Sequence, residues 1–315
     1  MGQRKKIILS IVFTLAIGFL KGQAPNDTKE VLTVTKEYYN NPNHTFIGAT
    51  VNVMATIPSV SGGIPLPGLQ ANAFIIPKSI LFLSGQVRAI SSLGLYTQKG
   101  QFGLASAQLE LGLFPFKKEI VKQLTFQTSE KGLMYTWRYP VKRNFRFGFV
   151  AGINTGSRYV QTGNDEATGI YWNGATDPRG NKLSLPFSFT DWSLGLGLMT
   201  TAWAKTSILL PNGDEVKKRY KALTVIRLSY VRLQDYSIPS NMEVETRGVT
   251  RNYQPQITDL QKWGIQFQGD FRRKWLSLLL TAGVATGPNY RFAEGEGGSF
   301  LNRTYVGLGA GFGWM

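Results

Sequence analysis

The chain contains no cysteine among its 315 residues, and it has a single histidine, His44. The absence of cysteine argues against a small disulfide-stapled domain and fits an exported protein that does not rely on disulfides. Beyond residue 20 there is also no apolar run near the ~20 residues that a membrane-spanning helix needs. The longest candidates, such as residues 276–280, are broken within a few positions by Ser, Thr, Gly or charge. Acidic residues are scarce too, 19 against 35 Lys and Arg.

The first residues have the layout of an export signal. A basic stretch at 1–6 precedes an apolar run at 7–20 and a small or polar stretch at 21–24. This order predicts a secretory signal peptide over residues 1–22, cleaved after Gly22. Its removal takes away four of the basic residues and leaves 31 against 19 acidic ones, a net charge of +12. An exported basic protein has little opportunity to bind nucleic acid, so anionic lipid, anionic solutes or an acidic partner are the expected contacts.

The chain ends in TYVGLGAGFGWM, with glycine at every second position from 307 to 313. A nucleotide-binding loop is excluded because no helix follows these glycines and position 312, where the motif needs glycine, is Phe312. The alternation instead predicts a strand with one apolar face and one nearly bare face. We expect the apolar face to lie outward and the glycines to face an interior. Two interpretations of that bare strip remain: bulky residues opposite, such as Phe82, Met199 or Trp203, fill the space, or the strip borders a solute path or a seat for segment 23–43.

Period-two alternation recurs along most of the remaining chain, which indicates strands rather than helices. We expect twelve of them, near residues 45–56, 68–76, 79–90, 100–114, 120–127, 131–140, 144–156, 187–204, 218–233, 260–271, 274–285 and 302–315. Aromatic residues such as Trp137, Tyr220 and Tyr230 lie at the ends of the apolar faces, as in the interfacial girdles of membrane barrels. The opposite faces carry charge in mid-strand, which a dry core seldom accepts.

The connections between these strands alternate in length. Those after even-numbered strands are short: 77–79, 115–119, 140–144, the region around 211–215, and 272–274. Most of the others are longer, especially 157–186, 234–259 and 286–301. Short periplasmic turns, long outer loops and an even strand count are typical of bacterial outer-membrane barrels.

In this architecture the chain resembles the Gram-negative outer-membrane β-barrel class, and its last strand, with Phe312 and Trp314, is similar to the C-terminal assembly strand of that class. Barrels of Bacteroidota secretion and motility systems have a similar size, but no particular residue links this chain to them. The resemblance implies an all-β, closed antiparallel transmembrane barrel of about 12 strands over residues 44–315, preceded by a periplasmic or lumen segment at 23–43. It also implies an outer-membrane location, lipid contact and assistance from the barrel-assembly machinery.

The alternation assigns the charged residues to two places. The expected lumen-facing charges are Arg88, Glu110, Arg138, Arg146, Asp191, Lys221, Arg227, Lys262 and Asp270. A basic rim is expected in or beside the periplasmic turns, formed by Lys117, Lys118, Lys142, Arg143, Lys217, Lys218, Arg272, Arg273 and Lys274. An open lumen of this composition would favour anions, whereas pairing of the charges, for example Arg146 with Asp191, would close it. The rim would attract lipid headgroups or an acidic periplasmic protein.

Catalysis on such a barrel needs a general base in the right place. His44 opens the first expected strand on the lumen side at the periplasmic end, where neither a lipid-facing Ser–His pair nor an outer-rim His–Asp pair can form. We therefore expect no enzymatic activity, no cofactor and no metal site. Two functions remain. The first is a small passive channel with an anion-leaning polar lumen. The second is a partner-binding subunit of an envelope secretion, assembly or motility complex that docks through the basic rim.

Overall fold

The computed structural model describes residues 35–58, 66–91, 103–130, 133–162, 170–172, 183–209, 213–240, 242–246, 249–253, 255–257, 260–288 and 304–315. The expected signal peptide at 1–22 and most of segment 23–43 lie outside these residues. Within them no helix is long and apolar enough to cross a membrane. The one helical element in the described part of the chain is the short 3-10 turn η1 (Pro77–Ser79).

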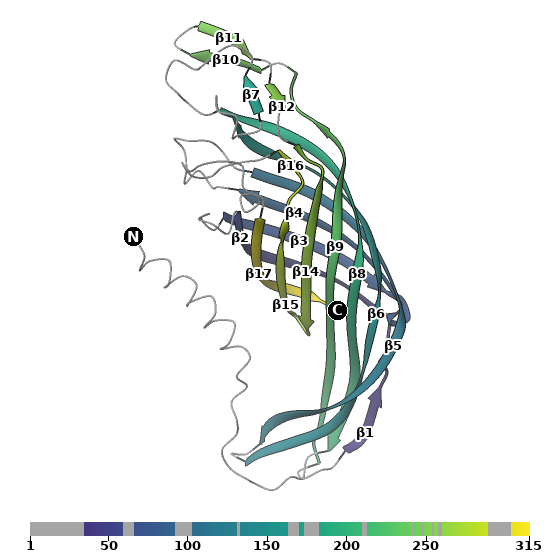
Figure 1. Cartoon of the computed structure of the whole chain (residues 1–315). Helices are drawn as coiled ribbons and strands as arrows, with labels where there is room; N and C mark the ends of the chain where they lie inside the picture. The colour runs from purple at the N-terminus through teal and green to yellow at the C-terminus, as the bar shows by residue number, and fades with distance from the viewer. Residues whose placement is uncertain are drawn as a thin grey trace, which may run out of the picture. The chain divides into compact units, whose positions relative to one another are not determined.

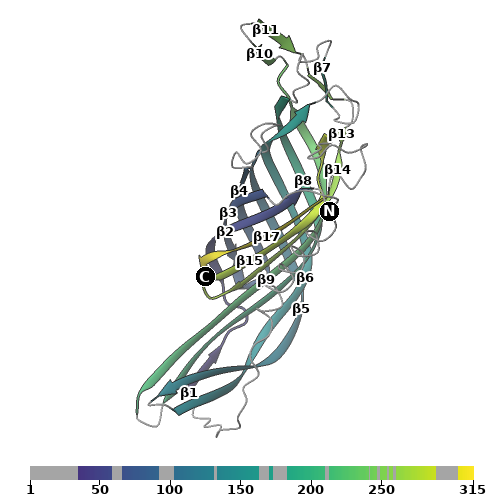
Figure 2. The same cartoon turned by 90° about the vertical axis from the view of Figure 1, so that its left-hand side faces the viewer.

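Ten antiparallel strands form a closed barrel, in which β8 pairs with β9 to complete the ring (Figure 1). The strands are β2 (Phe46–Pro58), β3 (Leu66–Ile76), β4 (Leu81–Ser91), β5 (Gly103–Glu130), β6 (Leu133–Thr162), β8 (Leu183–Leu209), β9 (Glu215–Ser237), β14 (Trp263–Arg273), β15 (Leu276–Val284) and β17 (Thr304–Trp314). Each strand pairs with its neighbour in chain order, and β17 closes back onto β2, as Figure 2 also shows. Closure leaves no free edge along the ring.

One further strand, β1 (Thr35–Asn40), lies outside the ring and pairs with the end of β8 over Ala204–Ile208. Three small two-stranded sheets accompany the barrel. They pair β10 (Met242–Thr246) with β11 (Val249–Tyr253), β12 (Pro255–Ile257) with β7 (Ile170–Trp172), and β13 (Leu260–Gln261) with β16 (Gly287–Pro288).

The expected count of about twelve strands is corrected to ten, because two pairs of expected strands are continuous. Residues 103–114 and 120–127 belong to β5, and residues 133–140 and 144–156 belong to β6. The expected turns at 115–119 and 140–144 therefore do not exist. Pro115 follows the last β4 partner on β5, Leu113, and Pro140 precedes the first β8 partner on β6, Asn144. At each proline, one edge of the strand is no longer paired with that neighbouring strand. The N–H that proline lacks therefore interrupts no inter-strand hydrogen bond on that edge.

The chain divides into two compact units, one containing residues 123–139 and the other containing residues 34–122 and 140–315. The first unit holds the outer part of the β5–β6 hairpin. Trp137 and Tyr139 are buried in this hairpin and Arg138 between them is exposed. The second unit contains the ten-stranded ring.

The alternation of the sequence becomes an inside and an outside of the barrel. On β17 the glycines face inward, and Leu308, Phe312 and Trp314 are exposed on the outer face. Two of the glycines are required by close approach to β2. A Cβ at Gly311 would lie 1.9 Å from the carbonyl oxygen of Val51, and one at Gly313 would lie 2.2 Å from that of Ala49. The glycine pattern therefore serves packing of the last strand against the first strand of the ring.

Candidate functional site: the barrel interior and its short-turn end

The two ends of the ring differ in their connections. We call the short-turn end the one at which β2 begins, β17 ends, and β3–β4 and β14–β15 are joined by tight turns; the opposite end is the loop end. At the β3–β4 turn Lys78 and Ser79 have φ values of 48° and 58°, and the Ile80 N–H donates to the Pro77 carbonyl oxygen over 3.1 Å. Two successive positive φ values match the right-handed twist of the paired strands, which makes this hairpin tight.

Apolar side chains fill the interior near the short-turn end. Phe82 and Met199, at 1% and 0% exposure, come from strands on different parts of the ring. The buried cluster consists of Phe46, Phe74, Ile76, Phe82, Phe114, Val150, Met199, Trp203, Leu223 and Val225, with Met315 packed against it. Large side chains opposite small ones are how small barrels fill their interior. Gly112 and Gly197 both lie against the ring of Phe114, which occupies the space that their missing side chains leave.

An ionic cluster lies directly against these aromatic rings. The Arg227 guanidinium pairs with Glu110 and with Asp270, and it lies 5.3 Å from the centroid of the Phe82 ring. Arg272 contacts the same Asp270 over 3.5 Å and lies 4.0 Å from the centroid of the Phe74 ring. All four charged side chains are buried. The ion pairs and the aromatic rings that the cations face offset part of the cost of burying these charges.

A chain of amides continues from the ionic cluster toward the loop end. Gln268 donates to the Gln86 Oε1 over 3.2 Å, and Gln70 donates to the same oxygen over 3.0 Å. Gln86 in turn donates to Gln108. The Arg88 Nε then donates to the Gln70 Oε1 over 3.1 Å. The network ties together four strands of the ring, β3, β4, β5 and β14.

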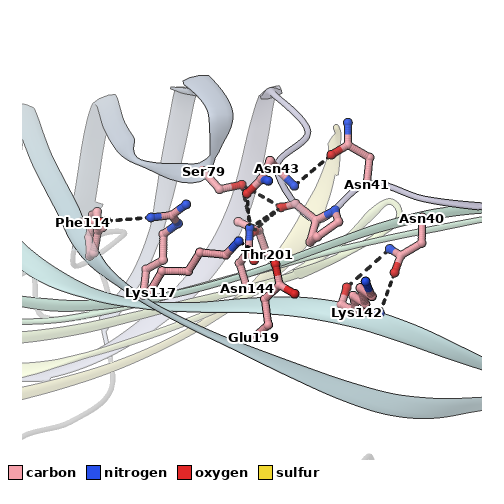
Figure 3. A network of polar contacts seen from close by, with 12 residues as sticks. Asn40, Asn41, Asn43, Ser79, Phe114, Lys117, Glu119, Lys142, Asn144 and Thr201 are labelled. Carbon is pink, nitrogen blue, oxygen red and sulfur yellow. Dashed lines mark hydrogen bonds and ion pairs between the residues drawn. The ribbon is translucent and has the colours of Figure 1, made fainter.

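The segment between β1 and β2 covers the interior from the short-turn end (Figure 3). Its anchor is the Pro42 carbonyl oxygen, which accepts hydrogen bonds from the Asn144 Nδ2, the Thr201 Oγ1 and the Ser79 Oγ at 2.9, 3.1 and 3.0 Å. These three donors come from β6, β8 and the β3–β4 turn, and all are buried. Three different parts of the ring thus hold one carbonyl group.

His44 lies in the same segment, against the apolar cluster. Its ring stacks on that of Trp203 with 4.6 Å between centroids and meets Phe46 edge-on at 5.6 Å. Burial lowers the pKa of His44 below its ordinary value, and the charges of Lys221 and Lys205 lower it further. His44, expected on the lumen side at the periplasmic end, is thus partly buried against aromatic rings at the short-turn end.

Basic side chains surround the short-turn end on four strands. Lys117, Lys118, Lys142, Lys217, Lys218, Arg273 and Lys274 are exposed, and Arg143 is half-buried. Two carboxylates among them are paired with a neighbour on the same strand. Lys117 bonds Glu119 over 2.6 Å, which holds the pKa of that carboxyl below its usual value, and Lys217 lies 3.3 Å from Glu215. The surface therefore keeps an excess of positive charge.

Tyr220 brings two of these cations together. The Arg143 Nη2 donates to the Tyr220 hydroxyl over 2.6 Å, and the Arg143 guanidinium lies 5.6 Å from the ring centroid. Arg273, from the β14–β15 turn, lies 5.4 Å from the same centroid. Three elements of the ring thus present two guanidinium groups at one aromatic side chain. Arginine gathered in this way suits planar oxyanions such as carboxylates.

The lumen-facing charges predicted from the sequence lie in three kinds of position. Buried or half-buried inside the ring are Arg88, Glu110, Arg146, Asp191, Arg227 and Asp270. Lys221 is half-buried at the short-turn end, where its ammonium group donates to a backbone oxygen of Met315. Lys262 is exposed at the loop end, and Arg138 is exposed in unit 123–139.

The structure differs from the sequence analysis in one of the open alternatives, the pairing of Arg146 with Asp191, and in one expected position, that of Arg272. Arg146 and Asp191 do not pair: Arg146 lies opposite Met199 and donates to the Phe114 carbonyl oxygen over 3.3 Å, whereas Asp191 accepts from Thr286 over 3.0 Å. The register places Asp191 opposite Asn154 instead. Arg272 was expected on the basic rim, but it points into the barrel and is 4% exposed. Its even position on β14 shares the inward face of Gln268 and Asp270, which alternation alone could have indicated.

Several site residues were missed because they carry no charge and belong to no motif. Ser79, Asn144, Thr201 and Pro42 meet only through long-range closure of the ring. Tyr220 was read as an interfacial aromatic, yet it is buried at 6% exposure. From Leu223 onward the buried positions of β9 are odd-numbered, but the buried Tyr220 is even-numbered. Alternation extended from the barrel part of β9 therefore places Tyr220 on the outer face, where it does not lie.

Comparisons with known proteins give no family assignment: no protein-family model matches the chain, and no curated protein is significantly similar in sequence. Among the described residues no group of three or more His, Cys, Asp or Glu side chains is placed to hold a metal ion.

Proposed function

We propose that this protein is an outer-membrane β-barrel that serves as a docking subunit of an envelope complex. The membrane part of this proposal is supported by the outer face of the ring. Every one of its ten strands exposes large apolar side chains there, including Val51, Leu69, Leu83, Leu111, Phe149, Leu194, Leu228, Ile265, Leu278 and Leu308. A water-soluble protein seldom exposes so extended an apolar surface, whereas a lipid-facing barrel requires one.

The height of this apolar band fits a bilayer. At the loop end Trp192 and Tyr230 meet edge-on at 6.3 Å, and at the short-turn end Trp275 stacks on Phe312 at 5.2 Å. Strand β14 runs between the two ends, and its ten residue steps at about 3.4 Å and a tilt of about 40° give a height of ~26 Å. This estimate is close to the ~25 Å apolar band of outer-membrane barrels.

The docking part rests chiefly on the contact of Arg143 and Arg273 with Tyr220. The two guanidinium groups are oriented by one buried tyrosine, and exposed lysines lie at the same end of the barrel on β5, β6 and β9 and in the β14–β15 turn. If the short turns face the periplasm, as in other outer-membrane barrels, this surface is available to a periplasmic protein. We infer that the partner is acidic, since charge complementarity selects and orients such a contact.

A passive channel is the second candidate, and the interior gives it less support. The apolar cluster, the ionic cluster and segment 41–44 occupy successive parts of the described lumen. Anion-selective conduction would require a polar path past Phe82 and Met199, both of which are fully packed. We therefore expect the purified protein to give no discrete conductance steps in planar lipid bilayers. Reproducible anion-selective steps that persist in independent preparations would restore the channel.

The docking proposal is tested by purifying the tagged protein in mild detergent from its own outer membranes. The wild type is compared with the double variant Arg143→Gln/Arg273→Gln and with Lys262→Gln, which removes an exposed cation at the loop end. We expect one acidic protein in stoichiometric amount with the wild type and with Lys262→Gln, and its loss from the double variant and above about 0.5 M salt, where the Debye length falls to a few Å.

Two results would oppose the docking proposal. The first is that the wild type purifies alone and that a photoreactive side chain at position 217 crosslinks to no protein in intact cells. The second is a double variant that loses only binding to anionic phospholipid vesicles and keeps its protein partner, which would assign the basic surface to lipid headgroups.

A further inference from the structure

The loop end of the interior contains a cavity of about 120 Å³ that the docking proposal does not use. Its lining comes from the loop-end parts of nine strands and includes Arg88, Gln108, Asn154, Asp191 and Trp192. It lies on the far side of the glutamine network from the apolar cluster. At ~30 Å³ for each molecule of liquid water, this volume would hold a few waters or one small solute.

Arg88 lines this cavity and has a hydrogen-bond donor that no other group among the described residues uses. Its Nε is committed to the Gln70 Oε1, and Gln70 is itself held by Gln86, so the guanidinium plane is fixed. Its Nη2 is buried and has no hydrogen-bond partner in the part of the chain that the structure describes. Buried polar groups in native proteins are nearly always satisfied by protein, water or ligand. A buried guanidinium nitrogen without a partner, on a residue that lines a cavity, therefore indicates a missing acceptor.

We propose that this cavity binds a small carboxylate, held by the guanidinium group of Arg88. A carboxylate matches the planar fork of arginine. The apolar walls that Ile90, Phe189 and Val231 contribute suit a short hydrocarbon group. Asp191 also lines the cavity and is fixed by the Thr286 hydroxyl at 3.0 Å. Its negative charge disfavours a doubly charged phosphate more strongly than a singly charged carboxylate.

The test measures acetate binding to the full-length detergent-solubilised protein by saturation-transfer NMR, at constant ionic strength maintained with chloride. Inorganic phosphate is titrated in parallel by ³¹P line broadening. We expect saturable acetate binding in the millimolar range and phosphate binding at least several-fold weaker. Arg88→Gln should reduce acetate affinity at least tenfold. The matched control Arg232→Gln removes an exposed arginine at the same end of the barrel and should leave it unchanged.

Other outcomes overturn the proposal. The proposal fails if acetate binding does not saturate, or if acetate binds Arg88→Gln as tightly as the wild type. Water would then be the hydrogen-bond partner of Arg88 in the cavity. Phosphate that binds as tightly as acetate contradicts the assignment to carboxylates. If Arg88→Gln does not reach the heat-modifiable folded form, Arg88→Lys takes its place, since it retains the charge but loses the planar fork. Its affinity should fall several-fold, and an unchanged affinity would show that the guanidinium is not the determinant.

Discussion

The Asn40 side chain takes the place of a neighbouring strand for Lys142. The Lys142 N–H donates to the Asn40 Oδ1 over 2.6 Å, and the Asn40 Nδ2 donates back to the Lys142 carbonyl oxygen over 3.4 Å. The same Nδ2 also donates to the Trp203 carbonyl oxygen at 2.7 Å. Strands β6 and β8 pair only as far as Asn144 and Thr201. Beyond that point β1 pairs with β8 in place of β6. The Asn40 side chain then bonds the backbone N–H and carbonyl groups of Lys142, which no longer face β8.

We expect Asn40→Ala to release the short-turn end without unfolding the barrel. The variant leaves both polar groups of Lys142 to be hydrated by water, because these hydrogen bonds are exposed, and the loss of local stability should be about 0.5 to 1.5 kcal/mol for each hydrogen bond. Hydrogen exchange should accelerate at the amide of Lys142 and remain slow at Phe147 in the ring. Lys142→Ala is the matched control, because only its backbone takes part. Equal protection in Asn40→Ala and the control would show that the amide bridge does not hold β6.

The order of the strands, their alternation and the closed barrel could be predicted from the sequence because they depend on local patterns. The strand count could not, because Pro115 and Pro140 are turn signals by composition, and only the positions of β4 and β8 show that they lie on unpaired strand edges. The inward position of Asp270 and Arg227 also followed from alternation. Their pairing with each other and with Glu110 did not, since Glu110 and Arg227 are 117 positions apart and meet across the interior.

A charge on the outer face distinguishes a lipid-facing barrel from a water-facing one. Leu109 and Phe116 lie on β5 with 56% and 60% exposure, but Leu109 pairs with Gly85 in the middle of the ring and Phe116 follows the last β4 contact. In lipid, Leu109→Arg should cost about 2 to 4 kcal/mol, because an arginine near the bilayer midplane loses its hydration. Phe116→Arg should be nearly neutral. The measurement is urea unfolding in phospholipid vesicles, followed by tryptophan fluorescence.

Water around the barrel would give a different result for the same pair of variants. Exposed surface substitutions in water usually change stability by no more than about 0.5 kcal/mol. If both variants unfold at the urea concentration of the wild type, the outer face of β5 is not buried in lipid and the membrane part of the proposed function fails.

Arg227 should be the most sensitive charged residue of the interior. It is 3% exposed and is shared by Glu110 and Asp270, so Arg227→Gln leaves two buried carboxylates without their common cation. Removing one partner of a buried ion pair costs about 3 to 5 kcal/mol, and we expect a loss of this size in urea unfolding. Adding Glu110→Gln should recover part of the lost unfolding free energy, because a neutral amide then replaces one of the two carboxylates left without Arg227. Arg232→Gln, on the exposed face of the same strand, is the control.

A double variant that is no more stable than Arg227→Gln alone would contradict this account. The loss would then come from the packing of Arg227 against Phe82 and not from its charge.

The single histidine makes the pH dependence of the short-turn end directly measurable. Burial against Trp203 lowers the pKa of His44, and the charges of Lys221 and Lys205 add to this effect. The imidazole resonance should therefore titrate below 6.5, the ordinary value. Because the folded pKa is depressed, neutral His44 contributes stability above pH ~6.5, and this contribution is lost as pH falls below that value. His44→Phe keeps the stacking but cannot titrate, so its stability should fall less than that of the wild type between pH 7 and pH 5.

The lysine contribution can be separated from burial with one substitution. Lys205→Gln removes the smallest of the three causes and should raise the His44 pKa slightly without bringing it to the ordinary value, because burial acts first. A midpoint at or above 6.5 in the wild type would mean that protonated His44 is favoured in the folded protein, for example through a cation–π contact with Trp203. Stability would then rise on acidification, which is the opposite sign to the one expected here. The NMR titration and the unfolding series thus test the same contact through two independent quantities.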